Sequence, residues 1–344
     1  MDYLRYEKKG WKLAAAGMIA LALLAAGGCG TRPAATAGDY AVEEEQKLIV
    51  YTSHKEEVYG PIIKEFEERT GIWVEVQDGG TTELLEAIRR EAGQGTCDVM
   101  FGGGVESYEA YQECFEPYVC GQNELLDDEY QSLDGRWTPF TELPIVFIYN
   151  NKLVDEKEAP EGWAEFLTGR WKGKIAFADP RKSGSSYTAV ATMAQVLEMD
   201  VRPMLKDFVA ALDGNISAGS GEVVDEVSAG IRLVGITLEE TARKRIALGA
   251  DIAMVYPSEG TSAVPDGCAM VRGAPHRENA GLFIDFTVSD DVQRLAEDQF
   301  CRRSVRKDIR KENIGGSMKI VDYDVEWAGR NQDEILGIWA ELVD

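Results

Sequence analysis

The sequence is poor in the residues and motifs that most enzymes and metal sites need. Only two histidines, His54 and His276, occur among 344 residues. There is no Cys-x-x-Cys pair, no Gly-x-Ser-x-Gly elbow, no His-Glu-x-x-His motif and no phosphate-binding P-loop. The sequence therefore predicts no metal site, no cofactor and no catalytic residues, and it favours a binding protein over an enzyme.

Basic residues are scarce as well. Lys and Arg number 36 against 60 Asp and Glu, and the formal net charge is −24. A nucleic-acid partner needs a basic surface that neutralises phosphates, so this composition excludes nucleic acid as the expected partner. An anionic ligand would have to be held by local groups, against the field of the whole protein. The basic stretch from Arg302 to Lys311 is interpreted as a solvated face that pairs with the surplus acid.

Long apolar runs are absent apart from one near the N-terminus. Leu13–Ala26 is apolar over 14 residues and follows four basic residues. A membrane-spanning helix needs about 20 residues. A short apolar run behind basic residues is typical of a secretory signal peptide, which we expect over residues 1–28.

A cysteine follows this run directly, in the segment Ala26-Gly27-Gly28-Cys29. The segment resembles a bacterial lipobox, which implies cleavage before Cys29 and a diacylglycerol on its thiol. Residues 29–43 then form a tether between the membrane and the folded domain. We expect an extracytoplasmic, membrane-anchored lipoprotein, at the cell surface or in the periplasm; an ordinary signal peptide with a chance cysteine is the alternative.

Five further cysteines stand at positions 97, 114, 120, 268 and 301. Export permits disulfides, and the odd number leaves at least one thiol unpaired. Cys114 and Cys120 are close enough in sequence to pair. We interpret the five as small buried residues or as containing one structural bridge.

The rest of the chain alternates between strand and helix patterns. Leu48–Ser53 reads as a strand, and Val58, Ile62, Ile63 and Phe66 follow at helical spacing. Such alternation predicts a parallel α/β sheet. Further strands are predicted at 72–76, 98–101, 144–149, 174–178, 235–238, 252–256 and 268–272, and helices at 56–69, 83–92, 187–198, 203–212 and 278–286.

Four of the predicted strands run into segments rich in Ser, Thr and Gly. Ligands of open α/β sheets bind beyond the carboxyl ends of the strands. Helix N-termini there offer free N–H groups and a partial positive charge, which suits phosphate, sulfate or carboxylate. The alternative for each segment is a simple helix N-cap. The segments are 52–54, 78–82, 179–186 and 257–262.

Five stretches of the chain resemble one family, the bacterial extracellular solute-binding proteins of ABC importers in the class that takes ferric iron, phosphonates or sugar phosphates. They are VYTSHKEEVYGPIIKEFEERTGIWVEV (50–76), WKGKIAFADPRKSGSSYTAV (171–190), GITLEETA (235–242), MVYPSEGTSAVPDGCAMVRGAPHRENAGLFIDF (254–286) and RRSVRKDI (302–309). The resemblance implies a type II periplasmic-binding-protein fold, with two lobes, a hinge and a ligand cleft between them.

On this resemblance, residues 44–140 plus 258–312 form one lobe and residues 141–257 plus 313–344 form the other. The chain would cross between the lobes at PIVFIY (144–149) and IAMVYPS (252–258). Capture is then hinge closure around a small anionic solute, followed by docking on an ABC permease and its ATPase. We expect a monomer.

The ligand implied by the resemblance depends on two positions. His54 stands where iron-binding members have a histidine, but Tyr256 is followed by Pro257, whereas those members have an adjacent tyrosine pair. We therefore expect a phosphoryl-bearing anion, 2-aminoethylphosphonate or a sugar phosphate. A ferric-iron receptor using His54 and Tyr256 is the first alternative, and a surface enzyme that processes phosphoryl groups is the second.

The expected ligand-binding residues fall into two groups. The first would surround the phosphoryl group and the second would contact the rest of the ligand. They are Ser53, His54, Thr81, Ser183, Ser185, Ser186 and Thr188, and then Ser220, Glu222, Tyr256, Ser258 and Glu259.

Overall fold

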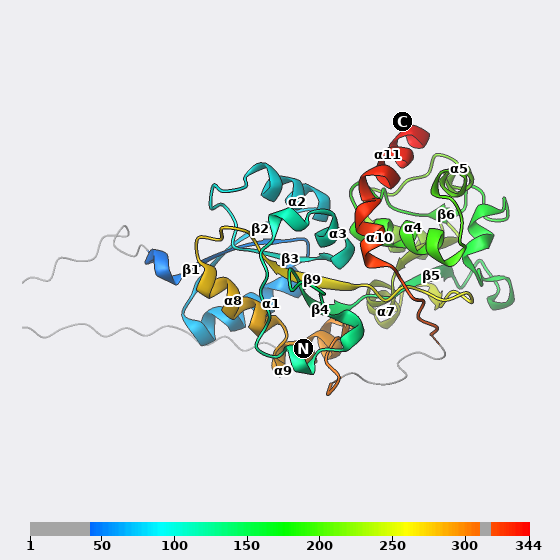
Figure 1. Cartoon of the computed structure of the whole chain (residues 1–344). Helices are drawn as coiled ribbons and strands as arrows, with labels where there is room; N and C mark the ends of the chain where they lie inside the picture. The colour runs from blue at the N-terminus through cyan, green and yellow to red at the C-terminus, as the bar shows by residue number, and fades with distance from the viewer. Residues whose placement is uncertain (1–41, 310–317) are drawn as a thin grey trace, which may run out of the picture. The chain divides into compact units, whose positions relative to one another are not determined.

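A computed structural model of the protein describes residues 42–309 and 318–344. The predicted signal peptide and Cys29 lie outside these residues. The described chain builds two β-sheets (Figure 1). Each sheet packs against its own apolar core. We call the part around the six-stranded sheet lobe one and the part around the four-stranded sheet lobe two.

The six-stranded sheet of lobe one has the order β10-β4-β9-β3-β1-β2, and the four-stranded sheet of lobe two has the order β6-β7-β5-β8. The strands are β1 (Lys47–Thr52), β2 (Trp73–Asp78), β3 (Val99–Gly104), β4 (Thr138–Glu142), β5 (Ile145–Asn150), β6 (Ile175–Ala176), β7 (Val234–Leu238), β8 (Ile252–Val255), β9 (Pro265–Met270) and β10 (Arg303–Ser304).

The helices cover the faces of these sheets. They are α1 (Glu56–Thr70), α2 (Thr81–Arg90), α3 (Val105–Ala110), α4 (Gly184–Val196), α5 (Val201–Leu212), α6 (Ser220–Ser228), α7 (Glu239–Ala247), α8 (Arg277–Thr287), α9 (Asp290–Phe300), α10 (Val325–Arg330) and α11 (Gln332–Val343). Among the described residues, none of the helices has both the length and the apolar character that a bilayer-spanning segment needs.

Helix α1 shows how sequence spacing becomes packing. Val58, Ile62, Ile63 and Phe66 all face the core of lobe one and are buried, as their helical spacing predicts. The helix ends at Gly71, which adopts a φ of 73°, a left-handed conformation that glycine takes without steric cost. The prediction of a helix over 56–69 is therefore confirmed.

The prediction of a parallel sheet is only partly correct. β1 runs parallel to β2 and β3, and β6 runs parallel to β7. In contrast, β9 is antiparallel to both β3 and β4, and β5 is antiparallel to β7 and β8. The route of the chain explains the antiparallel strands. The chain crosses from lobe one to lobe two between β4 and β5, and it returns between β8 and β9. Strands β5 and β9 therefore enter their sheets from the side where the two lobes are joined.

Strand β5 is buried on both faces, which explains its continuous apolar run. Ile145, Phe147 and Tyr149 belong to one core of lobe two, while Val146 and Ile148 belong to the core on the opposite face. Alternate side chains of a strand point to opposite faces, so a strand covered on both sides must be apolar at every position.

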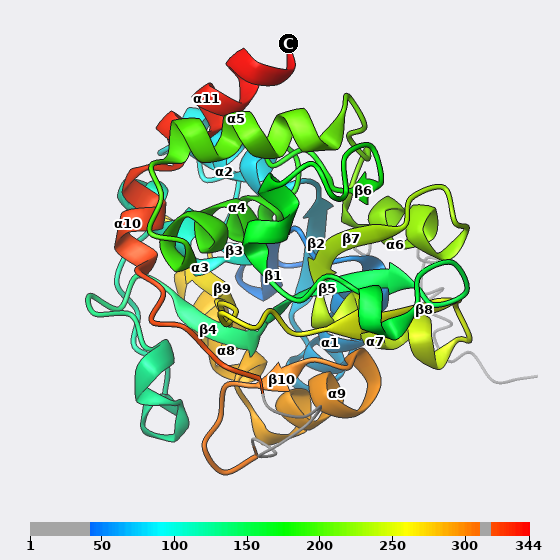
Figure 2. The same cartoon turned by 90° about the vertical axis from the view of Figure 1, so that its right-hand side faces the viewer.

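The C-terminal helix completes the larger core of lobe two. Trp339 on α11 is fully buried and packs against the rings of Phe177 and Phe208. Figure 2 shows α11 beside α5, which carries Phe208. The preceding α10 also contacts lobe one, since its Gly329 lies against α3.

We predict that Trp339→Ala lowers the free energy of unfolding by about 3–5 kcal/mol, because it removes a large buried ring and leaves a cavity. Urea unfolding monitored by circular dichroism measures the change. Trp73→Ala is the control: Trp73 is 53% exposed, so its loss should cost less than about 1 kcal/mol. Equal effects of the two substitutions would contradict the packing of α11 into this core.

Candidate functional site

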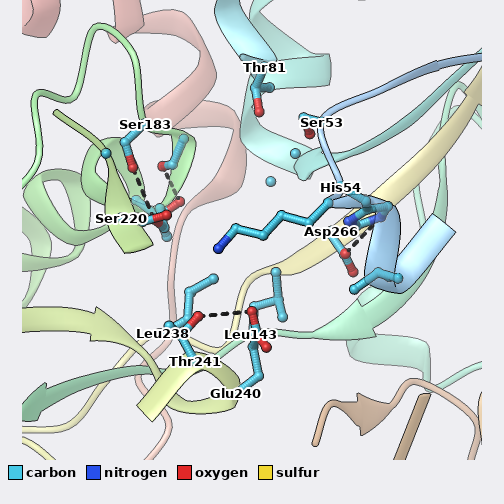
Figure 3. Close-up of a pocket in the computed structure, with 18 of the residues that line it drawn as sticks. Ser53, His54, Thr81, Leu143, Ser183, Ser220, Leu238, Glu240, Thr241 and Asp266 are labelled. Atoms are coloured by element: carbon cyan, nitrogen blue, oxygen red, sulfur yellow. Dashed lines mark hydrogen bonds and ion pairs between the residues drawn. The ribbon is translucent and has the colours of Figure 1, made fainter. Parts of the chain in front are cut away.

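A cavity of about 550 Å³ lies between the two lobes. This volume is in the range of pockets that hold small molecules. Lobe one lines it with residues that follow β1, β2 and β3, and lobe two lines it with the first turns of α4 and α6 and part of α7. Figure 3 shows Ser53, Thr81 and His54 on one side of the cavity and Ser183 and Ser220 on the other.

Three helices begin in the wall of this cavity. The N-cap residues of α2, α4 and α6 are Gly80, Ser183 and Gly219, and all three line the cavity. Ser183 accepts a hydrogen bond from the N–H of Ser186 at 3.3 Å, whereas the two glycines leave their first turns without a side-chain cap. Free N–H groups and the positive ends of three helix dipoles are therefore available to a ligand.

The end of β3 has to be glycine for this wall to form. Gly103 has a φ of +90°, and a methyl group built on it would lie 2.4 Å from Cγ2 of Thr81. No larger side chain fits without moving Thr81 out of place. Glycine at the end of β3 thus leaves the space that the first turn of α2 occupies.

Seven of the residues predicted from the sequence line this one cavity. They come from segments that are far apart in the chain, and the fold brings them together at this cavity. They are Ser53, His54, Thr81, Ser183, Ser185, Thr188 and Ser220. Their contact with a ligand stays a prediction.

Two of the remaining predicted residues support the wall from behind or from the side. The hydroxyl of Ser186 is buried and donates to the hydroxyl of Ser183 at 3.1 Å. The carboxylate of Glu222 accepts the backbone N–H of Ala218, just before α6. Neither side chain lines the cavity.

The other three predicted residues lie away from the cavity lining. The hydroxyl of Tyr256 donates to Glu239 at 2.5 Å. Ser258 donates to the neighbouring Glu259 at 3.0 Å, and Glu259 also accepts the N–H of Ala164 at 3.5 Å. The structure does not bring Tyr256, Ser258 and Glu259 into the wall of this cavity.

Charged residues form much of the lining, and sequence reasoning missed all of them. Two had a visible signal, since Lys55 follows His54 directly and Lys182 precedes Ser183. The full set is Lys55, Lys182, Lys244, Arg245 and Arg302 against Glu57, Glu240 and Asp266.

The acidic side chains of the cavity are all paired with basic ones. Glu57 of lobe one and Glu240 of lobe two both contact Lys244, at 3.1 and 3.2 Å. Asp266 pairs with Arg302 at 2.5 Å. By contrast, neither Lys55 nor Lys182 has an ion-pair partner within residues 42–309 and 318–344, so these two carry the uncompensated charge of the cavity.

The interpretation of the stretch from Arg302 as a solvated face is wrong for its first residues. Arg302, Arg303 and Arg306 are all buried. Arg303 holds Glu239 of lobe two through two hydrogen bonds of 2.6 and 2.9 Å. A buried arginine needs such a partner. The partner here lies 64 residues away in the chain, so the pattern of charges along the sequence does not identify it.

His54 forms the floor of the cavity together with Asp266. Its Nε2 lies 3.4 Å from Oδ2 of Asp266 and has no hydrogen-bond partner among the described residues. Burial lowers the pKa of His54 well below its usual range, and the charges of Arg302 and Lys244 lower it further. The ring is therefore neutral at neutral pH and can donate or accept a hydrogen bond according to its tautomer.

A buried carboxyl group links the lobes beside the cavity. Glu106 on α3 of lobe one accepts a hydrogen bond from the hydroxyl of Thr188 on α4 of lobe two. Its second oxygen, Oε2, has no hydrogen-bond partner in the described part of the chain. Burial raises the pKa of Glu106 to about 7, and the bond from Thr188 opposes that rise. Glu106 therefore changes its charge near neutral pH.

The described cysteines are all free thiols, and Cys97, Cys114, Cys120 and Cys268 are buried. They are small buried residues, as one of the two interpretations expects, and the pair Cys114–Cys120 is not bridged. No group of three or more His, Cys, Asp or Glu side chains in residues 42–309 and 318–344 is placed to hold a metal ion.

Comparison with known proteins gives consistent matches. The family model of bacterial extracellular solute-binding proteins matches residues 98–325. "Iron uptake protein A1" of Synechocystis is 28% identical over 293 residues, 79% of each chain. A protein of Salmonella typhi, assigned provisionally as a 2-aminoethylphosphonate-binding periplasmic protein, is 22% identical over 253 residues, 71% of this chain and 73% of its own.

A solved structure confirms the fold. The periplasmic binding protein AfuA from Actinobacillus pleuropneumoniae, with fructose-6-phosphate bound, superimposes with a TM-score of 0.79. The match covers 86% of this chain and 98% of AfuA at 23% identity. The expected two-lobed α/β fold of periplasmic binding proteins is thus confirmed.

We predict that stability depends on pH through Glu106. Its pKa is raised on folding from 4.5 to about 7, so the folded state binds more protons between these values. The free energy of unfolding should therefore fall as the pH rises from about 4.5 to 7, by on the order of 3 kcal/mol from this group alone.

Replacing Glu106 by Gln keeps a partner for Thr188 and removes this titration. Urea unfolding at pH 5, 6, 7 and 8 should show the variant gaining stability relative to the wild type as the pH rises. Glu86→Gln, on the exposed face of α2, is the control and should follow the wild-type curve. A constant difference between Glu106→Gln and wild type at every pH would contradict the prediction.

Proposed function

The chain belongs to the bacterial extracellular solute-binding proteins, the receptors of ABC importers, and from that premise we propose that it captures a small phosphoryl-bearing anion. The ligand class is 2-aminoethylphosphonate or a sugar phosphate, bound between the lobes and enclosed by hinge closure. Members of this family are transport receptors and not enzymes, so capture and release need no covalent chemistry. The receptor delivers its solute to an ABC permease and its ATPase.

The observation that carries this proposal is the unbalanced positive charge of the cavity. Lys55 and Lys182 form no ion pair within the described residues, and three helices begin in the same wall. A cavity of this kind favours an anion, because each free N–H group and each ammonium gains a charge-assisted hydrogen bond when the anion binds.

The hydroxyl groups of the lining support a phosphoryl group over a simple carboxylate. Ser53, Thr81, Ser183, Ser185 and Ser220 surround the cavity from both lobes. A phosphoryl group presents three oxygens and accepts bonds from several directions, whereas a carboxylate accepts in one plane. Two of the similar proteins point the same way, since one is assigned to 2-aminoethylphosphonate and one holds fructose-6-phosphate.

Ferric iron is a second candidate because the relative from Synechocystis is named an iron uptake protein. His54 lines the cavity and could serve as one ligand. Tyr256 does not line it, and its hydroxyl is bound to Glu239. Glu57, the acidic residue that α1 contributes to the lining, is already paired with Lys244. The geometry therefore supports an oxyanion better than a metal cation.

Lipid attachment at Cys29 is part of the proposal. A lipid on this residue would tether the folded domain outside the cytoplasm, at the cell surface or in the periplasm. The support comes from the apolar run, the small residues before Cys29 and the family, whose members are extracellular receptors.

Calorimetry with glucose 6-phosphate, 2-aminoethylphosphonate, inorganic phosphate and ferric citrate tests the ligand class. We expect binding of at least one phosphoryl compound. Replacing both Ser183 and Ser185 by Ala should weaken it at least about tenfold, since hydrogen bonds to charged groups contribute about 1.5–3 kcal/mol. Ser228→Ala, at the far end of α6 and outside the cavity, should bind as wild type.

Two outcomes would contradict the ligand class. Unchanged affinity of the Ser183/Ser185 double variant would remove the first turn of α4 from the site. Binding of ferric citrate without any phosphoryl compound, accompanied by a tyrosinate–iron absorption band, would favour the iron receptor instead.

We predict that Cys29→Ser releases the protein from the membrane fraction of a bacterial host that processes lipoproteins. The wild-type chain should sediment with membranes and should gain the mass of a diacylglycerol at its N-terminus. Cys301→Ser, which removes a thiol from the folded domain, is the control and should leave membrane association unchanged. A wild-type protein that is exported but stays in the soluble fraction would contradict lipidation.

A further inference from the structure

The two ring nitrogens of His54 have different surroundings. Nε2 is buried and lies 3.4 Å from Oδ2 of Asp266, which stands beside it in the wall of the cavity (Figure 3). Nδ1 has no hydrogen-bond partner among the described residues, and it is not enclosed by the protein as Nε2 is. Because the ring lines the cavity, Nδ1 is the nitrogen that a ligand meets.

The carboxylate of Asp266 can only accept a hydrogen bond from this ring. Its Oδ1 accepts the N–H and the hydroxyl of Thr141, both at 2.7 Å, and its Oδ2 accepts a bond from the guanidinium of Arg302. Burial raises the pKa of Asp266, and the charge of Arg302 and the bonds from Thr141 oppose that rise. With donors on both oxygens, the carboxylate is ionised at neutral pH.

This arrangement fixes the tautomer of His54. Burial and the charges of Arg302 and Lys244 lower the pKa of His54, so the ring is neutral and carries one proton. A proton on Nε2 faces the negative carboxylate of Asp266, whereas a proton on Nδ1 would leave the lone pair of Nε2 against it. The first tautomer is favoured, because such contacts are strong in a buried site. Nδ1 therefore presents a lone pair to the cavity.

A group that can only accept is exceptional in this wall. The backbone N–H groups of the first turns of α2, α4 and α6 can only donate, and so can the side chains of Lys55 and Lys182. The lining carboxylates are already paired with Lys244 or Arg302. An oxyanion without a proton satisfies the donors, but it places a negative oxygen against the lone pair of His54.

His54 lies on the side of the cavity that is expected to hold the phosphoryl group. Ser53 precedes it, and the two side chains meet at Gly102. A methyl group built on Gly102 would lie 2.9 Å from Oγ of Ser53 and 3.0 Å from Cε1 of His54. A phosphoryl group that takes a hydrogen bond from Ser53 therefore lies beside the imidazole ring.

We propose that His54 selects the singly protonated form of the phosphoryl group. A phosphate ester or phosphonate that keeps one proton donates its P–O–H to Nδ1 of His54, and its other two free oxygens accept from the surrounding N–H, ammonium and hydroxyl groups. A sulfate ester or sulfonate of the same shape has no such proton and is disfavoured.

His54 is thus a specificity-determining residue, and Asp266 is the positioning residue that fixes its tautomer. The inference rests on the proposed function, because it takes the ligand of the cavity to be a phosphoryl compound. It goes further by naming which protonation state is bound and which isosteric anions are rejected.

The tautomer is measured first, by nuclear magnetic resonance of the nitrogen-15-labelled protein without ligand. The chain has only two histidines, so the imidazole nitrogens are assigned by comparing the wild type with His54→Asn and His276→Asn. We expect a protonated Nε2 and a bare Nδ1 for His54 at pH 7. A protonated Nδ1 or a doubly protonated ring would overturn the inference, whatever the protein binds.

The second measurement is the affinity for matched pairs of ligands, by calorimetry at pH 6 and pH 8. The pairs are 2-aminoethylphosphonate with taurine, which is its sulfonate counterpart, and glucose 6-phosphate with glucose 6-sulfate. The sulfur compounds do not titrate in this range, so their affinities report any change in the protein itself. We expect the wild type to prefer the phosphorus compound, and this preference to fall about tenfold or more from pH 6 to pH 8, because the phosphoryl group loses its second proton near pH 6.

Two variants test the roles of the individual residues. His54→Asn places near Nδ1 an amide that can turn to donate or to accept, so the preference should no longer fall with pH. Asp266→Asn frees the ring to adopt the other tautomer and should act in the same direction. His276→Asn is the matched control: His276 is buried and lies 2.8 Å from Asp98, but outside the cavity, so this variant should keep the wild-type preference.

The outcomes separate the possible failures. Where Asp266→Asn fails to fold by circular dichroism, His54→Asn decides alone. A preference that rises with pH, as charge alone would give for a dianion, would overturn the inference, and so would a preference that His54→Asn leaves unchanged. If the wild type binds no phosphoryl compound, the proposed function fails, while the nitrogen resonances still decide whether His54 presents a lone pair to the cavity.

Discussion

The arrangement of the cavity depends on a set of buried ion pairs at the first turn of α7. Glu239 and Glu240 belong to lobe two, and they face Arg303 and Arg302 of lobe one. Glu239 and Arg303 are both buried, so separating them would leave charges without water or partner, at a large cost in free energy. These pairs fix how the edge of the six-stranded sheet approaches lobe two beside the hinge.

The same pairs determine the electrostatics of the ligand site. Arg302 neutralises Asp266, and Lys244 takes up the charges of Glu57 and Glu240. What remains is the charge of Lys55 and Lys182 and the positive ends of three helices. A protein with a net charge of −24 can therefore present a positive cavity. Exposed surface charges more than about 8 Å away are largely screened at physiological salt, so the local groups dominate.

Much of the fold could be predicted from the sequence because its signals are local. The spacing of Val58, Ile62 and Phe66 predicts α1, and the unbroken apolar run of β5 predicts a strand covered on both faces. Helices α3, α6 and α9 were not predicted. Helix α3 is only six residues long, and α6 begins with Ser220-Gly221, so neither has a strong periodic pattern. The antiparallel strands were also missed, because direction within a sheet depends on where the chain crosses between lobes.

The candidate site likewise contains some residues that the sequence reveals and others that it does not. Its hydroxyl and glycine residues are visible in the sequence because they stand where strands end and helices begin, which is a local property. On those grounds alone the sequence determined an α/β domain and the family resemblance, and it predicted an anion site at Ser183 and its neighbours. Only the tertiary structure decided which charges are free. Lys55 and Lys244 look alike in the sequence, yet one is unpaired and the other lies between two glutamates from different lobes. The charge that a cavity presents depends on pairings between residues distant in the chain, and no local pattern encodes them.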